Sequence, residues 1–195
     1  MDVIEAMHRR RSTRRFEPEG LLLPREMIEE LIEDATLAPS DLDLQPWRFV
    51  VVRDRERKEI LYQCAMRQEI LRDAAAVIIV CGDLRGYEAA GRVAAGWAGS
   101  GVVHPEDADK VAGSIRKTYA DNDRARWLLA TRGPCFATMS LMLLALERGI
   151  ATTPIVMFND DAVRRAFSIG ERFIPLALLA MGMPSTSEVQ PPRIP

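Results

Sequence analysis

The sequence predicts an α+β or α/β protein in which a central sheet is covered by helices. Segments with apolar residues at helical spacing alternate along the chain with short, continuously apolar runs typical of buried strands. A length of 195 residues suits one domain, and a hydrophobic content of 48% is enough to bury a sizeable core. No repeat or linker divides the sequence, so we expect a single domain over residues 1–195.

The N-terminal part of the chain predicts helices on both sides of one strand. Val3, Ile4 and Met7 recur at helical spacing before the chain becomes strongly basic. Pro24 suits the first turn of a second helix, which we expect to end in the turn-rich segment 38–41. The predicted elements are a helix at residues 3–11, a helix that starts at Pro24, a strand at residues 47–52, and a helix at residues 55–65 with Asp54 as its N-cap.

The remainder predicts three apolar strands and one long helix. The continuous apolar run at residues 74–81 is typical of a strand covered on both faces. Residues 122–148 predict a helix that is apolar on nearly every side after Ala137, which places it in the middle of the structure. The other predicted elements are helices joined by a mobile loop at residues 84–120 (a possible lid or insert), an extended segment at 152–158, a short helix capped by Asn159, a strand at 173–181, and an extended Pro-rich tail at 183–195.

Composition argues against several classes of protein. The formal net charge of −2 provides no field that would gather nucleic acid. The N-terminus carries acids among its apolar residues, unlike a secretory signal, and the apolar stretch at residues 137–146 is shorter than the roughly 20 residues of a membrane span. Cys64, Cys81 and Cys135 are widely spaced and form no CxxC, so we expect reduced thiols in or near a core. We therefore expect a cytoplasmic protein without a membrane partner.

The chemistry inventory points to a bound organic cofactor. The two histidines, His8 and His104, are not at ligand spacing from cysteines or carboxylates, so a metal site is not expected. The sequence has no phosphate-binding P-loop and no G-x-S-x-G elbow, and its glycines at residues 96–101 do not follow a strand as a dinucleotide fingerprint would. Without a nucleophile or metal constellation, the chain would bind and orient a cofactor that carries the chemistry.

A strongly basic segment at residues 9–16 places five arginines in eight positions. One interpretation is a solvated helix end whose charges offset the helix dipole. A second is a nucleic-acid patch. A third is a site for a small phosphorylated ligand, because guanidinium forks and a hydroxyl suit a phosphate. Composition alone leaves all three open.

Four motifs in order along the chain resemble the signatures of nitroreductase-family flavoproteins. They are Arg10-Arg11-Ser12-x-Arg14-x-Phe16, Ala38-Pro39-Ser40-Asp41-x-Asp43-x-Gln45-Pro46-Trp47-x-Phe49, Gly149-Ile150-Ala151-Thr152-Thr153-Pro154-Ile155, and Leu179-Ala180-Met181-Gly182-Met183-Pro184. Each motif alone is weak, whereas four in order span nearly the whole chain. On this resemblance the chain is identified as a member of the family.

The resemblance implies an α+β fold with a central mixed β-sheet flanked by helices, and a homodimer formed through long helices with two FMN molecules at the interface. Arg10, Arg11, Ser12 and Arg14 would contact the phosphate, the ribityl chain and the pyrimidine edge. The partner subunit would supply Pro39, Ser40, Asp41 and Asp43. The remaining cofactor-binding residues would be Gln68 and the segment Ile155, Val156 and Met157 at the flavin ring, and Arg193 at the phosphate. No side chain is expected to be an obligate catalytic acid or base.

This chain departs from the family pattern at Asp43, where relatives commonly have asparagine. A carboxylate only accepts hydrogen bonds, so it could bond flavin N3–H or ribityl hydroxyls but not flavin oxygens. It would also add negative charge beside a cofactor that becomes anionic on reduction. Met157 stands where many relatives have a small residue, and the tail lacks the usual second basic residue.

The function implied by the resemblance is an NAD(P)H-dependent FMN oxidoreductase that passes hydride through flavin N5 to a nitroaromatic, quinone or enone. One alternative is a specialised chemistry of the same family, such as reductive dehalogenation or flavin fragmentation, for which residues 84–120 would form a lid. Another is a flavin-binding protein without turnover. A nucleic-acid-binding module is the remaining alternative, and strongly salt-dependent DNA binding would favour it.

Overall fold

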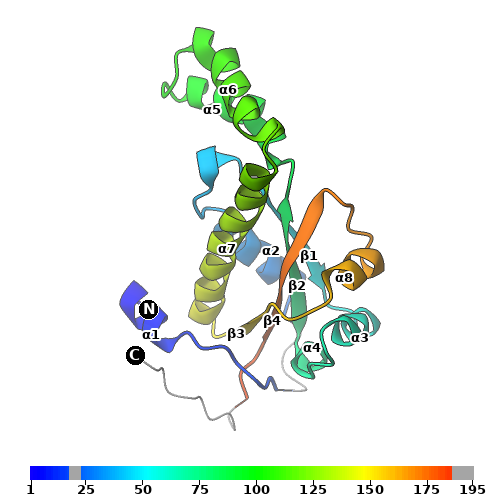
Figure 1. The fold of residues 1–195 in the computed structure, drawn as a ribbon. Helices are drawn as coiled ribbons and strands as arrows, with labels where there is room; N and C mark the ends of the chain where they lie inside the picture. Colours follow the sequence, from blue (N-terminus) through cyan, green and yellow to red (C-terminus); the bar gives the residue numbers. More distant parts are fainter. Residues whose placement is uncertain (18–22, 186–195) are drawn as a thin grey trace.

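The computed structural model describes residues 1–17 and 23–185 and has a four-stranded sheet at its centre (Figure 1). The strands are β1 (Trp47–Val52), β2 (Ala76–Asp83), β3 (Ala151–Ile155) and β4 (Phe173–Gly182), in the order β1-β2-β4-β3. All neighbouring strands pair antiparallel, so the expected mixed sheet is wrong for the described residues. A parallel pair needs a crossover that returns to the same end of the sheet, and here each paired strand enters from the opposite end. One isolated parallel bridge joins Ser12 to Thr152.

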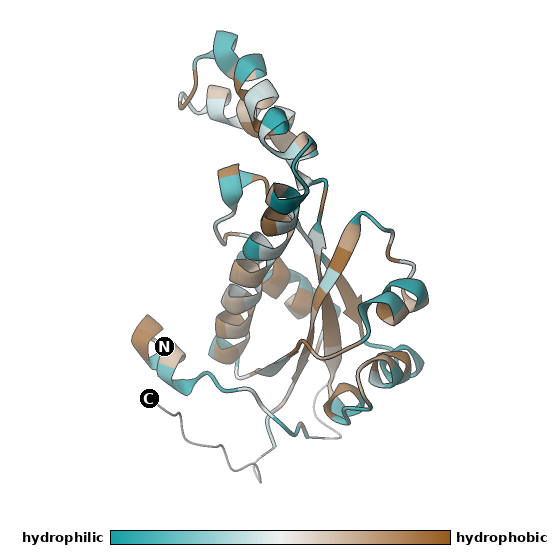
Figure 2. Ribbon diagram, viewed as in Figure 1, coloured by the Kyte–Doolittle hydropathy of each residue, from teal (hydrophilic) through white to brown (hydrophobic). Residues whose placement is uncertain are grey.

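Strand β2 lies between two hydrophobic cores, and every one of its residues is buried. Val77, Ile79 and Cys81 belong to one core cluster. The alternate residues Ala76, Ile78 and Val80 belong to the other. The predicted strand with both faces covered is therefore confirmed, because the continuous apolar run follows from burial on both sides. Figure 2 shows apolar residues concentrated in the sheet and along α7.

Helices cover both faces of the sheet. Helices α2 (Arg25–Ala35) and α7 (Asp123–Glu147) pack on one face, and α3 (Arg55–Cys64), α4 (Ile70–Asp73) and α8 (Asp160–Ala166) pack on the other. The predicted N-caps are present. Asp54 accepts a hydrogen bond from Arg57 N at 3.0 Å, and Asn159 accepts one from Ala162 N at 2.8 Å. Gly149 follows α7 with a φ of 72°, a conformation that suits glycine.

Residues 84–120 form a helical projection at the N-terminal end of α7 (Figure 1). It contains α5 (Ala90–Gly99), α6 (Ala108–Ala120) and the short 3-10 helices η2 (Gly86–Ala89) and η3 (Pro105–Asp107). The projection shares a small core with Leu44 of the 39–45 loop and Leu129 of α7. The rings of Tyr87 and Tyr119 stack there with their centroids 6.2 Å apart. It has the form of an insert, and its role as a lid stays a prediction.

Helix α1 (Val3–Arg9) lies near the C-terminal end of α7 (Figure 1). It ends two residues earlier than predicted, and Ala6 is its only buried residue. The side chains of Val3 and Ile4 are 75% and 72% exposed. A helix of seven residues is unstable by itself, so α1 needs a further surface to pack against.

Helix α7 is long and apolar enough to cross a membrane by length and composition, with a mean hydropathy of 1.4 in its most apolar window. The apolar part of α7 is therefore longer than residues 137–146, the stretch that the sequence indicated. Half of the window is buried inside this chain, where α7 packs on α2 and β2. This packing is that of a central core helix.

Candidate functional site

The arginine segment lies beyond α1 in an extended strand that is attached to the sheet. Thr13 N donates a hydrogen bond to Thr152 O at 3.2 Å, and Thr153 Oγ1 donates to Thr13 O. Phe16, 3% exposed, forms an antiparallel bridge to Pro184. The helix-end interpretation therefore applies only to Arg9, which forms an ion pair with Glu5 at 3.0 Å. The arginines from 10 onward follow the helix and are held by backbone pairing.

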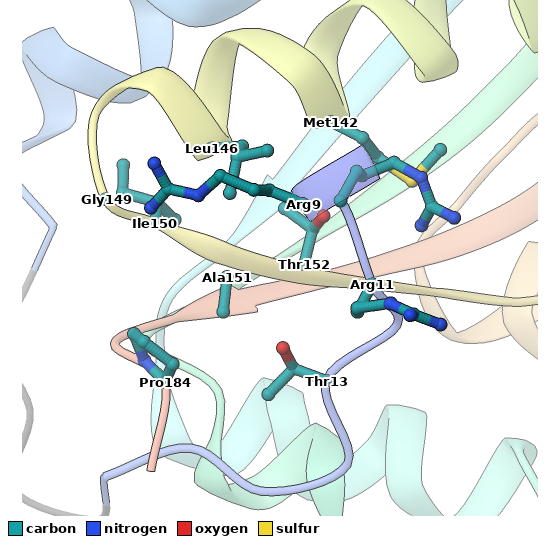
Figure 3. Close-up of a pocket in the computed structure, with 11 residues that line it drawn as sticks. Arg9, Arg11, Thr13, Met142, Leu146, Gly149, Ile150, Ala151, Thr152 and Pro184 are labelled. Atoms are coloured by element: carbon teal, nitrogen blue, oxygen red, sulfur yellow. The ribbon is translucent and has the colours of Figure 1, made fainter. Parts of the chain in front are cut away.

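A pocket of about 320 Å³ lies between this segment, the C-terminal end of α7 and the start of β3 (Figure 3). Its volume is at the lower end of small-molecule pockets, which range from about 300 to 1,000 Å³. Among the lining residues that the structure describes, three are arginines and none carries a carboxylate. They are Arg9, Arg10, Arg11, Thr13, Met142, Leu146, Gly149, Ile150, Ala151, Thr152 and Pro184. Guanidinium groups beside a hydroxyl suit a phosphate.

Strand β3 leads from this pocket to the residues predicted for the flavin ring. Gln68 Nε2 donates hydrogen bonds to Met157 O and Ala65 O, both at 3.1 Å. The side chains of Val156 and Met157 are 71% and 62% exposed, although both are apolar. Ile155 is buried in the core, so only its backbone is available to a cofactor. From Thr152 to Met157 an extended chain spans about 17 Å, which suits an elongated ligand.

Backbone strain concentrates in two loops that contain predicted site residues. Six described residues other than glycine have positive φ, and five of them lie in these loops: Leu42, Asp43, Gln45, Met66 and Arg67. Non-glycine residues in this region cost about 1 kcal/mol or more each and cluster at functional sites. The sequence analysis missed Met66 and Arg67, because residues 65–68 contain no glycine or asparagine that would have signalled a left-handed turn.

The second loop, residues 39–45, is held by its own side chains and by α7. Ser40 Oγ accepts a hydrogen bond from Gln45 N, and Asp43 Oδ1 accepts one from Gln45 Nε2, both at 3.0 Å. A Cβ on Gly133 of α7 would lie 3.4 Å from Ser40 Cβ and 3.2 Å from Pro46 Cδ. The close approach of the loop to α7 therefore favours glycine at position 133.

The two groups of predicted residues lie at different heights along α7 (Figure 1). The 39–45 loop packs on Gly133 in the middle of the helix, whereas the arginine pocket lies at Met142 and Leu146 near its C-terminal end. From Gly133 the helix rises about 14 Å to Met142 and about 20 Å to Leu146. The structure thus brings Arg10 and Arg11 together with β3, and Gln68 together with Met157, but it keeps Pro39, Ser40, Asp41 and Asp43 apart from both. Arg193 lies outside the described residues.

Other chemistries find no support in the part of the chain that the structure describes. No group of three His, Cys, Asp or Glu residues there could hold a metal ion. Burial raises the pKa of the Cys81 thiol to about 12, so this thiol stays protonated and unreactive at neutral pH. Cys64 is half-buried, while Cys135 is exposed on α7, contrary to the expectation that all three lie in or near a core. The periodic pattern could not distinguish a core face from a face open to a partner.

The model of the nitroreductase family matches residues 7–183, and the chain belongs to this family. YodC of Bacillus subtilis, described as a candidate NAD(P)H nitroreductase, is 31% identical over 195 residues, which cover 100% of this chain and 94% of YodC.

Solved structures agree with this assignment. A candidate nitroreductase of Bacillus subtilis, YdfN, superposes with a TM-score of 0.92 at 26% identity, over 98% of this chain and 93% of YdfN. A candidate nitroreductase from Exiguobacterium sibiricum, solved in complex with FMN, superposes with a TM-score of 0.89 at 28% identity, over 100% of this chain and 94% of that one.

Proposed function

We propose that this chain is an FMN-dependent oxidoreductase that takes electrons from NAD(P)H, and that a homodimer holds the flavin between its subunits. Family membership and the NAD(P)H nitroreductase name of the relative YodC support the class of reaction. The FMN complex of the Exiguobacterium relative supports the cofactor. Bound FMN would accept hydride at N5 from the nicotinamide and pass it to an acceptor.

The observation that carries the proposal is the arginine pocket and the strand that leads from it. Its arginines and Thr13, with no carboxylate among the described lining residues, fit a terminal phosphate. The exposed side chains of Val156 and Met157, at the far end of β3, offer an apolar surface for a flat ring. Gln68 fixes the backbone of Met157 there through its side-chain amide. Arg14 and Ser12 lie in the same extended segment, and we assign them to the phosphate and ribityl chain.

The separation of the two site parts supports a dimer. The loop packs at Gly133, about 14 Å along α7 from Met142 and about 20 Å from Leu146 of the arginine pocket, so we place the two parts at different cofactors. A twofold dimer that packs the α7 helices together would bring the loop of one subunit to the pocket of its partner. The exposed apolar residues of α1, with Phe136 of α7 at 49% exposure, provide further surface that a partner would cover.

For the acceptor we propose a nitroaromatic, quinone or enone. A groove of about 610 Å³ joins the strained Leu42 of the site loop to the projection, where its walls include Trp97, Val102 and Ile115. Such apolar walls suit a small organic acceptor rather than a polymer. An enone reductase from Lactiplantibacillus plantarum, named for CLA biosynthesis, is 25% identical over 93% of this chain, which supports keeping enones in this set. With a net charge of −2, we propose a cytoplasmic enzyme without nucleic-acid or membrane partners.

Three measurements test the proposal. Mass spectrometry of the released cofactor should find FMN at one per subunit, whereas FAD, riboflavin or no flavin after reconstitution would contradict it. Anaerobic mixing with NADH and with NADPH should bleach the flavin, which separates a catalyst from a flavin-binding protein without turnover. Sedimentation should find a dimer, and a flavin-loaded monomer at micromolar concentration would overturn the two-subunit site. An acceptor screen that includes halogenated aromatics then tests the specialised chemistries.

A further inference from the structure

An ionic cluster at the start of the projection contains none of the residues discussed so far as cofactor contacts. Asp83, the last residue of β2, has no exposed surface. It accepts hydrogen bonds from Arg172 Nε at 2.6 Å and Arg172 Nη2 at 2.7 Å, a bidentate pair. Arg48 Nη2 lies 3.5 Å from its carboxylate. We call the pair of Asp83 and Arg172 the clamp.

The clamp is attached to the 39–45 loop through the backbone. Asp83 N donates a hydrogen bond to Pro46 O at 2.7 Å. Pro46 itself fits between two glycines, since a Cβ on Gly86 would lie 2.8 Å from Pro46 Cβ and one on Gly133 would lie 3.2 Å from Pro46 Cδ. The C-terminal end of the strained 39–45 loop is therefore fixed by Asp83 on one side and by α7 on the other.

The clamp is attached to the projection as well. Asp83 Oδ1 accepts a hydrogen bond from Arg85 N at 2.9 Å, which shapes the turn into η2. Arg172 Nη1 forms an ion pair with Glu88 of η2 at 3.2 Å, and Leu84 N donates to Arg172 O at 3.0 Å. Residue 83 thus contacts both parts: its backbone N–H bonds the end of the loop at Pro46, and its carboxylate bonds the first turn of the projection. The pair with Arg172 holds this carboxylate, and with it the backbone from which the N–H reaches the loop. A buried ion pair is weak evidence for stability alone, but a fully satisfied one fixes a unique arrangement.

We propose that Asp83 and Arg172 are positioning residues that hold the 39–45 loop and the projection in place for the flavin bound by the partner subunit. This inference rests on the proposed two-subunit site. In the proposed dimer, each flavin site combines the arginine pocket of one subunit with the 39–45 loop of the other. A clamp variant should therefore damage the site that contains its loop and spare the site that contains its arginine pocket. The clamp touches neither the arginine pocket nor Gln68, because it lies at the other end of the sheet.

Heterodimers with two different affinity tags test the inference, with FMN affinity as the readout. Asp83→Asn homodimers should bind FMN about tenfold or more weakly, since a small misplacement of a positioned group has effects of this order. A heterodimer of one Arg14→Ala and one Asp83→Asn subunit should then bind one FMN with the wild-type Kd. Both substitutions affect the site made of the first subunit's arginine pocket and the second subunit's loop, so the other site is intact. A heterodimer of wild type with an Arg14→Ala/Asp83→Asn subunit should have no wild-type site.

The inference is overturned if the first heterodimer has no wild-type site and the second has one. An unchanged Kd in Asp83→Asn homodimers overturns it as well. A general loss of stability would impair both sites equally, so Leu31→Ala, a buried change in α2 chosen to match the loss of Tm, is the control and should keep the wild-type Kd. If Asp83→Asn does not fold, Arg172→Lys keeps the charge and removes the bidentate geometry, and the same pattern is expected of it.

A reference heterodimer, in which the loop itself is altered, distinguishes failure of the inference from failure of the proposed function. Asp43→Trp places a bulky ring at an exposed position of the loop. If the two-subunit site is correct, the heterodimer of Arg14→Ala with Asp43→Trp keeps one wild-type site. If it keeps none, the two-subunit site is overturned. If it keeps one while the clamp heterodimer keeps none, only the positioning role is overturned.

Discussion

The two parts of the candidate site are held in place by different physical means. The arginine segment is attached to the sheet by backbone pairing to β3 and by the buried ring of Phe16. The 39–45 loop has no strand pairing, and its own hydrogen bonds to Gln45, the buried side chain of Leu44 and close packing on Gly133 hold it instead. Substitutions in the first part should therefore change ligand contacts directly. Substitutions around the second should act through the position of the loop.

The largest effect is expected where α7 approaches the sheet beside the loop. A Cβ on Gly82 would lie 1.8 Å from Ala130 O, so Gly82→Ala forces α7 away from β2. We expect a loss of about 3 kcal/mol or more in the free energy of unfolding, since backbone atoms cannot yield as side chains do. For a chain of this size the Tm should fall by about 6–12 °C. Thermal melts of Gly82→Ala and of Gly96→Ala, where a Cβ meets nothing within 4 Å, provide the measurement and its control.

In the arginine segment, Arg14→Ala should weaken FMN binding far more than folding. Arg14 is exposed and lies in the segment held by backbone pairing, so its removal leaves the strand in place. A charge-assisted contact to phosphate contributes about 1.5–3 kcal/mol, or about 10- to 150-fold in affinity. A fluorescence titration with FMN and a thermal melt measure the two effects. An unchanged Kd would mean that Arg14 makes no contact with the phosphate.

In the loop, Asp43→Asn should raise the flavin midpoint potential. If Asp43 lies close to the partner's flavin, its negative charge disfavours the anionic reduced form, and its exposure in one subunit means that solvent weakens the effect. We expect a rise of tens of millivolts, since about 30 mV corresponds to about 1.4 kcal/mol for a two-electron couple. Potentiometric titration of wild type and Asp43→Asn measures the two midpoint potentials. If Asp43 only supports the turn through Gln45, stability changes and the midpoint does not.

The smallest effect is expected from the exposed counterpart of the clamp, the pair of Glu59 and Arg72 on α3 and α4. Hydrogen bonds from Arg72 and Gln63 lower the pKa of Glu59 to about 2. Because this pKa is below the unfolded value, the pair stabilises the fold above about pH 4.5, and this contribution is lost as the pH falls toward about 2. The Tm difference between wild type and Glu59→Gln should be small at pH 6 and vanish near pH 2. A large difference at neutral pH would show that this pair matters as much as the clamp.

Sequence alone determined the elements and the chemical class of the site. The continuous apolar run at residues 74–81 predicted β2 with both faces covered, and Asp54 and Asn159 marked helix starts, because these signals are local. The arginine segment and the ordered motifs indicated FMN, and the family match agrees with that interpretation. The antiparallel order of the sheet was not determined, since strand pairing depends on how the connecting helices return the chain.

Tertiary structure alone decided which of the predicted residues lie together. Nothing in the sequence places the 39–45 loop about 14–20 Å along α7 from the arginine pocket, because that distance depends on where each segment meets the helix. The strain at Met66 and Arg67 was equally hidden, because ordinary residues there adopt a conformation that only the surrounding packing maintains. The clamp joins residues 83 and 172, and a contact across such a sequence separation arises only when β2 and β4 pair.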